Sequence, residues 1–501
     1  MSSDTSDRVI TSNLPITLKI AIVARSLSTP LLVAIDSSAI LTVIIASFYL
    51  RDSLFRSIFP TIFPEKLLAD TLSHIWWFPI VLIICLSYEN LYQKRLPYWK
   101  EVELILKAIT LAVIFVVIIL YLSKTAVEVS RALIGLIWLM LAFVLPLFRY
   151  AGKLLLTRIG VYKRPVLIIG AGKTACLLAN ALRREKTMGY EAVGILNDRG
   201  ECAEVFTEAP ASDIPILGKV EQAEYLIRKT RVQDIFIAMP ALSAGETVKL
   251  VNRLQPLVSN VVLIPDLFGL SMSGIEAECF FEEQVLMLNI KNRLKPVFNR
   301  AIKRLFDLML GSILFLLFTP LLFAISILIK LDSKGPVFYN GYRLGQRGKI
   351  FECHKYRTMY DDSAEIHKNY LANNSEAQKE WAKYRKLKGH DPRLTRVGKV
   401  LRRFSLDELP QLINVLTGEM SLVGPRPYLP SEKEAMEDWS EDILVAKPGI
   451  TGLWQVSGRN LIDFDGRLKL GAWYVKNWSL WLDLIILLKT FRVVIKGEGA
   501  Y

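Results

Sequence analysis

The chain has 501 residues, of which 52% are hydrophobic, and it carries a net charge of +14. Its mean hydropathy of +0.33 is high for a soluble protein. The length predicts about three domains of roughly 100–200 residues each. The five cysteines form no CxxC pair and the four histidines show no metal-ligand spacing, which argues against a disulfide framework and against a zinc site. The basic charge suits nucleic acid, anionic lipid or phosphorylated substrates, and charge alone does not choose among them.

The N-terminal part of the chain is dominated by apolar runs. Each is near the roughly 20 residues that a helix needs to cross a bilayer, and they are Pro30–Leu50, His74–Tyr92, Ala108–Leu122 and Ala132–Phe148. Basic residues precede the first run and follow the second and the fourth. The positive-inside rule therefore places the N-terminus, the middle loop and the rest of the chain in the cytoplasm. Asp36 lies inside the first run, either as a functional carboxylate or as a buried contact between helices.

A fifth apolar run, Leu308–Ile329, contains no charged residue but has basic residues on both flanks. Positive charge on both sides conflicts with crossing the membrane. Pro320 lies in the middle of the run, where it removes a helical hydrogen bond and kinks the axis. We therefore favour a re-entrant helix that bends at Pro320 and returns to the cytoplasmic face, over an ordinary kinked transmembrane helix.

The middle of the chain alternates strand and helix patterns. Four runs rich in Val and Ile and bounded by turn residues indicate strands: Pro165–Gly172, Glu191–Asp198, Asp234–Pro240 and Asn260–Asp266. The helical stretches between them predict a parallel α/β sheet.

The first of these strands ends in the pattern G-x-G-x-x-A, with Gly170 and Gly172 as the two glycines. Such a turn can bring a phosphate to a helix N-terminus, which makes these glycines a candidate nucleotide-binding loop. The same turn also serves plain strand–helix packing, and Asp198 lies further along than the acid of a dinucleotide fingerprint. We favour a scaffold or regulatory role for this domain.

The C-terminal segment surrounds a few carboxylates with cations. Arginine forks and lysine point charges suit diphosphate recognition, and the candidates are Arg343, Lys355, Arg357, Arg393, Arg402 and Arg426. Carboxylates can hold Mg²⁺ or act as nucleophiles, and the candidates are Asp361, Asp362, Asp407 and Glu408.

The adjacent pair Asp407 and Glu408 is the strongest catalytic candidate. Neighbouring acids on a helix point about 100° apart, so one can face a reacting phosphorus while the other holds a metal. Pro410 is tolerated if both acids lie in the first turn of a helix, with Ser405 as its N-cap. The same residues also make an ordinary helix start, and from the residues alone both interpretations stay open.

Long blocks of the C-terminal part, Gly335–Tyr501, resemble the bacterial polyprenyl-phosphate sugar-1-phosphate transferases. The matching blocks are GPVFY, KYRTM, DPRLTRVG, SLDELPQL, GEMSLVGPRP, KPGITGLWQVSGR, YVKNWSLW and the terminal GAY. The whole chain is similar to the large members of this family, above all to those that transfer galactose-1-phosphate. The resemblance implies a four-helix transmembrane domain over 1–160, a Rossmann-like α/β domain over 161–290, and a monotopic α/β catalytic domain with a re-entrant helix over 291–501.

The resemblance also implies an activity. A sugar-1-phosphate, with galactose-1-phosphate as the first expectation, would pass from a UDP-sugar to undecaprenyl phosphate, releasing UMP and starting an O-antigen, capsule or exopolysaccharide. Asp407 matches the nucleophile, and Glu408 matches a second acid associated with Mg²⁺. Pro320 matches the break of the re-entrant helix. The remaining matches are basic positions near the bound phosphates, Lys355, Arg402 and Arg426, to which we add Arg357 as a neighbouring candidate.

We expect a multi-pass protein of the bacterial cytoplasmic (inner) membrane whose catalytic domain faces the cytoplasm. Its expected partners are the UDP-sugar, undecaprenyl phosphate and membrane lipids, with a homodimer as an unsurprising state. Nucleic acid is not expected, because the basic residues cluster beside apolar segments. The amphipathic tail Trp478–Ile495 is expected at the membrane interface.

Three alternatives stay open. The donor sugar could be glucose or an N-acetylhexosamine. The middle domain could be a nicotinamide-dependent epimerase or dehydratase, since Tyr225 and Lys229 have the Tyr-x-x-x-Lys spacing. The chain could also be a non-catalytic assembly protein. One departure from the family bears on this question, because Gly471 stands where relatives often carry an acid. We favour a structural role for that position.

Overall fold

The computed structural model describes residues 17–58, 68–123, 129–170, 172–197, 214–230, 232–265, 276–280, 285–289, 294, 296–374, 376, 378, 391–437, 439–458 and 462–496. The chain forms two compact units, Met1–Asp266 and Leu267–Tyr501. Each unit is described by itself.

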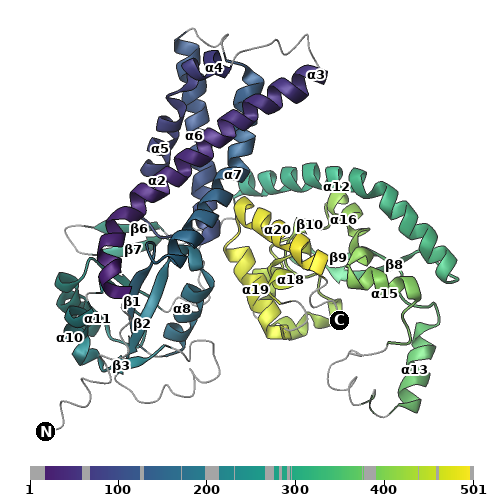
Figure 1. The fold of residues 1–501 in the computed structure, drawn as a ribbon. Helices are drawn as coiled ribbons and strands as arrows, with labels where there is room; N and C mark the ends of the chain where they lie inside the picture. The colour runs from purple at the N-terminus through teal and green to yellow at the C-terminus, as the bar shows by residue number, and fades with distance from the viewer. Residues whose placement is uncertain are drawn as a thin grey trace. The chain divides into compact units, whose positions relative to one another are not determined.

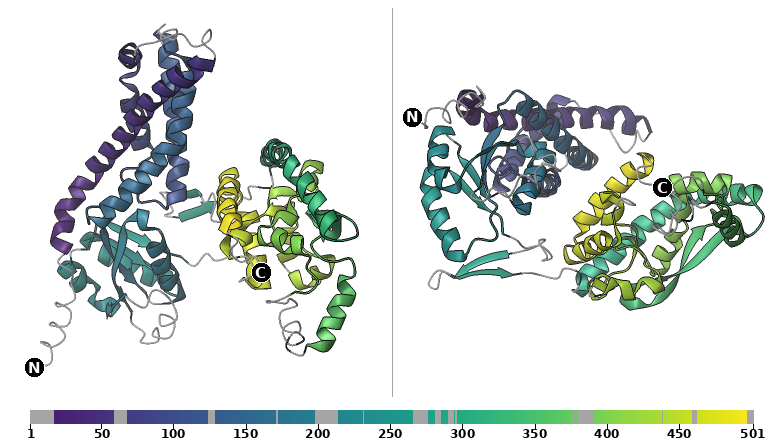
Figure 2. Two further views of the ribbon diagram at one scale, coloured as in Figure 1. Left: turned by 45° about the vertical axis from the view of Figure 1, so that its right-hand side comes forward. Right: turned by 90° about the horizontal axis from the view of Figure 1, so that it is seen from below.

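The first unit begins with long apolar helices that run side by side (Figures 1 and 2). Its helical elements are α2 (Thr17–Leu50), the π-helical turn η1 (Arg51–Phe55), α3 (Arg56–Ile58), α4 (Leu68–Ile75), α5 (Phe78–Tyr88), α6 (Tyr98–Leu122) and α7 (Arg131–Arg158). Small side chains at the contacts, among them Ala39, Ala108 and Ala112, are fully buried and let the helices approach closely.

Among the described residues, four helices are long and apolar enough to cross a membrane. Leu27–Ser53, Tyr98–Leu122 and Arg131–Arg158 belong to this unit, and Val297–Asp332 belongs to the second. The expected second span, His74–Tyr92, is the exception. The apolar helical stretch there, Ser73–Tyr88, is shorter, and a turn at Trp76 and Trp77 divides it between α4 and α5. The apolar run had suggested one continuous helix there.

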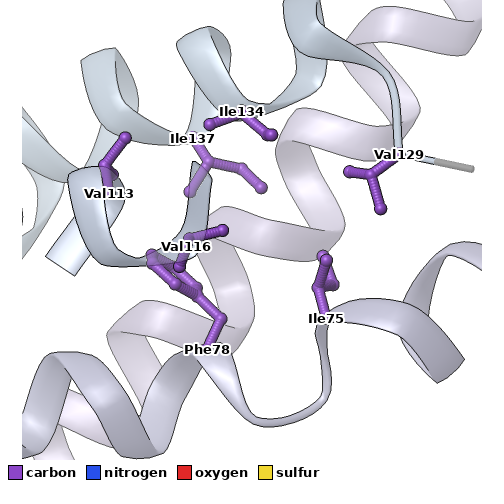
Figure 3. A pocket seen from close by; sticks show the side chains of 7 residues that line it. All are labelled: Ile75, Phe78, Val113, Val116, Val129, Ile134 and Ile137. Carbon is purple, nitrogen blue, oxygen red and sulfur yellow. The ribbon is translucent and has the colours of Figure 1, made fainter. Parts of the chain in front are cut away.

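A small apolar cavity lies among α5, α6 and α7 (Figure 3). Every side chain that lines it is aliphatic or aromatic, namely Ile75, Phe78, Val113, Val116, Val129, Ile134 and Ile137. Because the lining has no polar group that would orient a ligand, we interpret the cavity as a packing defect.

Buried charges hold the same helices together. Arg149 Nη1 lies 2.7 Å from Asp36 Oδ2, and Arg149 Nε lies 2.8 Å from Glu101 Oε1. Lys153 Nζ donates to Glu101 Oε1 at 2.5 Å, and Tyr92 donates its hydroxyl proton to Asp36 at 2.8 Å. Of the two interpretations of Asp36, the structure therefore supports a buried contact between helices, in which each charge has a partner.

The rest of the first unit is a parallel α/β sheet with strand order β3-β2-β1-β4-β5. Its strands are β1 (Arg164–Ile169), β2 (Tyr190–Leu196), β3 (Ile216–Gly218), β4 (Asp234–Ile237) and β5 (Asn260–Leu263), and its helices are α8 (Lys173–Arg184), α10 (Ala223–Thr230) and α11 (Ala244–Leu254), with short 3-10 turns η2 (Lys186–Met188), η5 (Val220–Gln222) and η6 (Gln255–Leu257). In β1, Ile168 packs with α8, whereas Leu167 and Ile169 pack with the layer of α10. Helices thus cover both faces (Figure 1), which confirms the predicted parallel sheet.

Arg95, in the loop before α6, connects the helical part of this unit to its sheet part. Arg95 Nη1 donates to the backbone oxygens of Tyr162, at 2.8 Å, and Met188, at 2.7 Å. Its guanidinium carbon also lies 4.1 Å from the centroid of the Tyr162 ring. Nearby, the backbone N–H of Tyr98 donates to Glu185 at 3.2 Å. The loop before α6 is therefore part of one body with the sheet.

The second unit contains the long helix α12 (Val297–Asp332) and small sheets surrounded by short helices (Figure 1). Its strands are β6 (Glu276–Phe280) and β7 (Val285–Asn289), β8 (Phe338–Leu344) and β9 (Ile350–Tyr356), and β10 (Ser421–Val423) and β11 (Gly449–Thr451). The first two pairs are antiparallel and the third is parallel. Its further helices and turns are η7 (Gln346–Gly348), α13 (Ser363–Asn373), α15 (Arg396–Arg403), η8 (Leu406–Glu408), α16 (Gln411–Thr417), η9 (Pro430–Glu432), η10 (Glu434–Met436), α17 (Trp439–Ile443), α18 (Leu453–Ser457), α19 (Phe464–Lys476) and α20 (Leu480–Lys496).

Helix α12 runs without interruption through Pro320, and its axis bends (Figure 1). Proline has no N–H to donate to the carbonyl one turn earlier. Beside it, Thr319 Oγ1 donates to the backbone oxygen of Phe315 at 2.7 Å. Apolar side chains along the helix are exposed, including Leu316 and Phe323. The helix bends as expected (Figure 1), whereas the position of the bend at Pro320 and the return to one membrane face stay predictions.

The first half of α12 is anchored by buried polar contacts. Lys303 Nζ donates to Asp483 Oδ2 of α20 at 2.7 Å and to the Val423 carbonyl of β10 at 3.0 Å. Asp307 accepts from the Ser421 hydroxyl at 2.8 Å and from the Leu422 N–H at 3.1 Å. These bonds fix α12 to the core of the unit.

Candidate active site

Asp407 and Glu408 lie together in a short 3-10 turn, η8. The sequence had predicted the first turn of an α-helix capped by Ser405. Ser405 does precede the turn, but its φ is +55° and its side chain makes no capping bond. Pro410 then stands at the N-cap of α16, so Leu409 and Pro410 separate the acids from that helix. The difference arises because proline suits a helix start and leaves the two acids outside it.

Lys355, on the antiparallel strand β9, faces this turn. Its Nζ donates to Glu408 Oε1 at 2.6 Å. Burial lowers the pKa of Lys355, but the charges of Glu408 and Asp407 raise it by more, so that the net pKa lies above the ordinary value. Lys355 is therefore a fixed positive charge beside both acids.

Asp407 is the acid with the more perturbed titration. Burial raises its pKa most, the charge of Glu408 raises it further, and Lys355 and Arg402 partly oppose both, which gives a pKa of about 6. At neutral pH the carboxylate is mostly ionised yet more basic than an ordinary aspartate. That combination suits a nucleophile or a base, and such perturbations gather at functional sites.

Arg402 is held at the end of α15 by a tight contact with the segment after β9. Its Nε donates to the Thr358 hydroxyl at 3.0 Å, and the Thr358 carbonyl accepts from the N–H of Thr395 at 3.1 Å. Thr395 also caps α15 by accepting from the N–H of Gly398 at 2.9 Å. A Cβ at Gly398 would lie 2.0 Å from the Thr358 oxygen, so only glycine allows this approach.

Asn414 joins the two segments that carry the acids and the lysine. Its Nδ2 donates to the Glu352 carbonyl of β9 at 2.7 Å, and its Oδ1 accepts from the N–H of His354 at 3.0 Å. The side chain is fully buried in α16. Asn414 therefore keeps Lys355, the next residue of β9, in register with the turn before α16. Sequence reasoning missed this residue, since a lone amide in a helix carries no spacing signal.

Arg357 lies in a different environment from the one we predicted. Its guanidinium is buried and donates to the backbone oxygens of Lys334, at 2.6 Å, and Ser333, at 2.9 Å. Gly335, with φ of +115°, leaves room for the guanidinium. These bonds hold the segment that follows α12. They use Nη1 and Nη2 of Arg357, the same guanidinium nitrogens that would donate to a phosphate. Phosphate binding by Arg357 stays a prediction, and we leave it out of the proposed site.

Arg426 belongs to a second cluster, around Trp454 of α18. The guanidinium carbons of Arg426 and Arg467 lie 5.5 Å and 5.3 Å from the centroid of the Trp454 ring. Within the described residues, no hydrogen bond or ion pair joins this cluster to Asp407. The sequence pointed to Arg426 but not to Arg467 or Trp454, although Trp454 lies in a block that carries the resemblance.

The glycine loop of the first unit has a plain packing role at its first position. Gly170 has φ of +112°, and a Cβ there would lie 2.4 Å from the Ala238 oxygen of the neighbouring segment. Gly172 is the N-cap of α8 and has open space around it. Asp198 lies outside the described residues. Nucleotide binding by this loop stays a prediction.

Two further positions raised by the sequence are placed by the structure. Tyr225 and Lys229 lie one turn apart on α10, where Lys229 Nζ donates to the Tyr225 hydroxyl at 3.1 Å. Gly471 is buried in α19, and a Cβ there would meet Ile443 at 3.6 Å and Pro425 at 3.8 Å. The surroundings of Gly471 are apolar, in agreement with a structural role.

No group of three or more His, Cys, Asp or Glu side chains able to hold a metal occurs in the described part of the chain. A metal at this site would have to use one or two carboxylates together with oxygens of the substrate. Mg²⁺ commonly binds in that way, through one or two carboxylates plus substrate phosphates. Only one Glu408 oxygen is bonded to Lys355, so the residues fit such an ion.

Comparison with known proteins identifies the class of this site. Residues 298–497 match the family described as bacterial sugar transferase, and residues 90–265 match a family described as CoA-binding domain. The chain is 36% identical over 414 residues to the undecaprenyl-phosphate galactose phosphotransferase of Salmonella typhimurium, covering 82% of this chain and 84% of the relative. It is 37% identical over 410 residues to the UDP-galactose-lipid carrier transferase of Erwinia amylovora, again with 82% and 84% coverage.

A third relative has a different sugar in its name. The chain is 32% identical over 346 residues to the UDP-glucose:undecaprenyl-phosphate glucose-1-phosphate transferase of Escherichia coli, covering 68% of each chain. The chain belongs to the bacterial sugar transferase family, as its sequence blocks predicted. It is a membrane enzyme of the sugar phosphotransferase type.

Proposed function

We propose that this enzyme transfers galactose-1-phosphate from UDP-galactose to undecaprenyl phosphate, releases UMP, and so initiates a surface polysaccharide. The observation that carries the proposal is Asp407, a carboxylate with a pKa of about 6 beside Lys355 and Arg402. The names of the two relatives with 36% and 37% identity support galactose as the sugar.

The first half of the reaction is a displacement at phosphorus. An oxygen of Asp407 attacks the sugar-bearing phosphorus, a new P–O bond forms to the carboxylate, and the bond to the bridging oxygen breaks. UMP leaves with that oxygen and its electron pair. Attack by a carboxylate on a diphosphate brings negative charges together, and Lys355 and Arg402 offset that repulsion. Burial removes water from around the Asp407 carboxylate, which disfavours its ionised form, raises its pKa to about 6 and makes it more basic.

The second half returns the enzyme to its starting state. An oxygen of undecaprenyl phosphate attacks the phosphorus of the phosphosugar–aspartyl intermediate. The acyl oxygen–phosphorus bond breaks, Asp407 is regenerated as a carboxylate, and the product is a lipid-linked diphosphosugar. The same cations serve this step, because it passes through the same kind of charged transition state.

Mg²⁺ would be held by Glu408 together with diphosphate oxygens, and it would neutralise charge that develops on the leaving phosphate. Glu408 has a second task in the protein itself. Its bond to Lys355 at 2.6 Å keeps the lysine at the turn. Removing Glu408 should therefore disturb both the ion and the position of the lysine.

The finer membrane arrangement also belongs to this proposal. We infer that α2, the helix pair α4–α5, α6 and α7 cross the bacterial cytoplasmic membrane, and that α12 enters it and returns at the bend near Pro320. Basic residues flank α12 on both sides, and its apolar side chains are exposed. The sites would then face the cytoplasm, where sugar nucleotides are made.

The test is UMP release by the purified protein with Mg²⁺, undecaprenyl phosphate and a panel of UDP-sugars. UDP-galactose should support release, and Asp407→Asn should abolish it. Labelled phosphosugar should also stay on the protein when the lipid is omitted. Release with UDP-glucose alone would select the second candidate sugar, which the Escherichia coli relative favours. No release and no labelling with any donor, in a folded sample, would refute the transferase.

A further inference from the structure

The hairpin of β8 and β9 carries Lys355 on one of its two faces. In an antiparallel pair, residues directly opposite each other point to the same face. Tyr339 of β8 lies opposite Lys355, and Gly341 lies opposite Cys353. Cys353 is buried in a core that includes residues of α16, and Lys355 reaches η8 through its bond to Glu408. The face that holds Tyr339 is therefore the face that meets α16 and the turn with the two acids.

The two strands differ in how far this face is covered. On β9, Phe351 and Cys353 are buried, whereas on β8 Tyr339 is 60% exposed and Arg343, which lies opposite Phe351, is half-buried. Burial raises the pKa of the Cys353 thiol, and the charges of Lys355 and Arg343 oppose that rise, which agrees with both cations lying on this face. Strand β8 therefore presents an open row of side chains next to the covered row of β9.

A glycine in the open row lets an aromatic ring and a guanidinium converge. The position that a Cβ of Gly341 would occupy lies 3.4 Å from Arg343 Nη1 and 3.6 Å from Tyr339 Cε1. A methyl group there would only touch both neighbours, whereas a longer side chain would stand between them. Gly341 thus keeps the ring and the guanidinium next to each other.

Both groups have capacity left for a ligand. Within the described residues, no second ring and no cation packs on the face of the Tyr339 ring, and its hydroxyl makes no hydrogen bond. Arg343 Nη1 donates to the Tyr342 carbonyl at 3.0 Å, and in the same part of the chain the guanidinium has no carboxylate partner. A single exposed aromatic residue is common on protein surfaces. This one lies beside the lysine of the site and shares its position with an unpaired cation.

We propose that Tyr339 and Arg343 bind the sugar ring of the donor, which stacks on the tyrosine while its hydroxyl oxygens accept from the arginine. The inference rests on the proposed function, which supplies a UDP-sugar as substrate. One face of a pyranose ring consists of C–H groups, and such a face packs well on an aromatic ring. A few converging polar groups then fix the orientation of the ligand.

The reach from Lys355 favours the sugar over the uracil. Cβ atoms of directly opposite residues are about 4.5–5.5 Å apart, so Tyr339 stands immediately beside the lysine that bonds to Glu408. The sugar is joined to the reacting phosphorus through one oxygen, whereas the uracil lies beyond a second phosphate and a ribose. The part of the donor that an aromatic ring next to Lys355 meets first is therefore the sugar.

The experiment measures equilibrium binding of UDP-galactose, and separately of UDP, to the full chain in detergent. All variants are made in an Asp407→Asn background, which does not consume the donor. Tyr339→Leu should weaken binding of UDP-galactose about threefold to tenfold. Binding of UDP, which has no sugar on its second phosphate, should stay within about twofold, and this retained binding also shows that the variant is folded. Arg343→Gln should weaken binding of UDP-galactose about tenfold with the same selectivity.

Two controls isolate the ring of Tyr339. Tyr339→Phe keeps the ring and should bind UDP-galactose within about twofold of the parent. Tyr342→Leu removes a tyrosine of the same strand that is 68% exposed and points to the other face. It should change the binding of neither ligand.

The outcomes separate this inference from the proposed function. Unchanged UDP-galactose affinity in Tyr339→Leu, with sugar transfer intact in the unmodified enzyme, would overturn the inference alone. Equal weakening of UDP and UDP-galactose would place the ring against the uracil and would also overturn it. If UMP release selects glucose as the sugar, UDP-glucose replaces UDP-galactose in the same measurements. Failure of the unmodified enzyme to become labelled from any UDP-sugar would instead refute the proposed function.

Discussion

The titration of Asp407 should govern the pH dependence of phosphosugar–enzyme formation. Its pKa of about 6 stands above the ordinary 3.8, so the rate of the first half-reaction should rise through about pH 6 and level off above about pH 7. Two neighbours should move that midpoint in opposite directions. Glu408 raises the pKa of Asp407, and Lys355 lowers it.

The magnitude follows from the kind of neighbour. An opposite charge within about 4–6 Å lowers a carboxyl pKa by about 1–3 units. Lys355→Met should therefore raise the midpoint by about 1 unit or more, whereas Glu408→Gln should lower it. Both variants should also lower the plateau rate, because the proposed mechanism has Lys355 and Glu408 act on the bound phosphates. The plateau rate should fall in both variants, whereas the midpoint pH should move in opposite directions. The direction of the midpoint shift is therefore the result that tests the assignment.

The assay is a rapid-quench measurement of labelled phosphosugar on the protein, without lipid acceptor, from about pH 5 to about pH 9. A control is Lys349→Met, which removes a lysine at a position outside the acid cluster, between η7 and β9. Its midpoint should equal that of the unmodified enzyme. A shift of both test variants in the same direction, or a midpoint that neither moves, would refute the assignment of this titration to Asp407.

Three further predictions concern stability. The pKa of Asp407 is about 6 in the folded state instead of 3.8, so the folded state binds this proton more tightly than the unfolded state. The free energy of unfolding should therefore fall by about 3 kcal/mol as the pH rises from about 4 to about 6, at 1.36 kcal/mol per pKa unit. Asp407→Asn should therefore melt higher than the parent at about pH 7.5 but equally at about pH 4, and a constant difference would contradict this. Gly471→Ala should raise stability by about 0.5–1 kcal/mol, because the new Cβ meets Ile443 at an ordinary 3.6 Å; a lower melting temperature would show that the site is tighter. Arg149→Leu should lower the free energy of unfolding by about 3–5 kcal/mol, because it leaves Asp36 buried without its 2.7 Å ion pair. An unchanged melting temperature would mean that water already solvates the charges of Asp36 and Arg149.

The sequence predicted those elements that local patterns determine. Strands such as Arg164–Ile169 and Asp234–Ile237 are buried on both faces, so their unbroken apolar runs identify them. Pro320 predicts a bend in α12 for an equally local reason, since it lies inside the helix and has no N–H to donate. The resemblance supplied Asp407, Glu408, Lys355, Arg402 and Arg426 as candidates, and the structure brings the first four of these together.

Other features depend on contacts that no local pattern contains. The break at Trp76 and Trp77 lies inside a run that is apolar throughout. An arginine such as Arg357 can bind phosphate, and only the folded structure reveals that its guanidinium donates to the backbone of the segment after α12. The pairing of Arg467 with Trp454 joins two helices that are separate in sequence. Long-range contacts of this kind are visible only in three dimensions.

The helix α12, whose apolar surface is exposed, also packs against the turn that carries Asp407 and Glu408. Ile325 and Ile329 of α12, which follow Pro320 in the chain, are buried against a group that includes Leu406 and Leu409, the residues on either side of Asp407 and Glu408. Tyr356, which follows Lys355, donates its hydroxyl proton to the Leu322 carbonyl of α12 at 2.7 Å. A change in the position of α12 should therefore shift both the turn that carries Asp407 and Glu408 and the strand that carries Lys355.

Tyr356→Phe tests this connection, because it removes the bond to the Leu322 carbonyl and a longer one, at 3.4 Å, that the hydroxyl accepts from Ser326 Oγ of α12. The ring stays stacked on Phe338. The loss of the shorter bond, of ordinary strength, together with the weak longer one should slow transfer to undecaprenyl phosphate by about threefold to tenfold. Labelling by the UDP-sugar should stay within about twofold, since the Lys355–Glu408 bond remains. Tyr342→Phe, at an exposed tyrosine of β8, is the matched control and should change neither step. Equal slowing of both half-reactions by Tyr356→Phe would mean that α12 only supports the fold, whereas selective slowing of the lipid step would show that the helix positions the acceptor at Asp407.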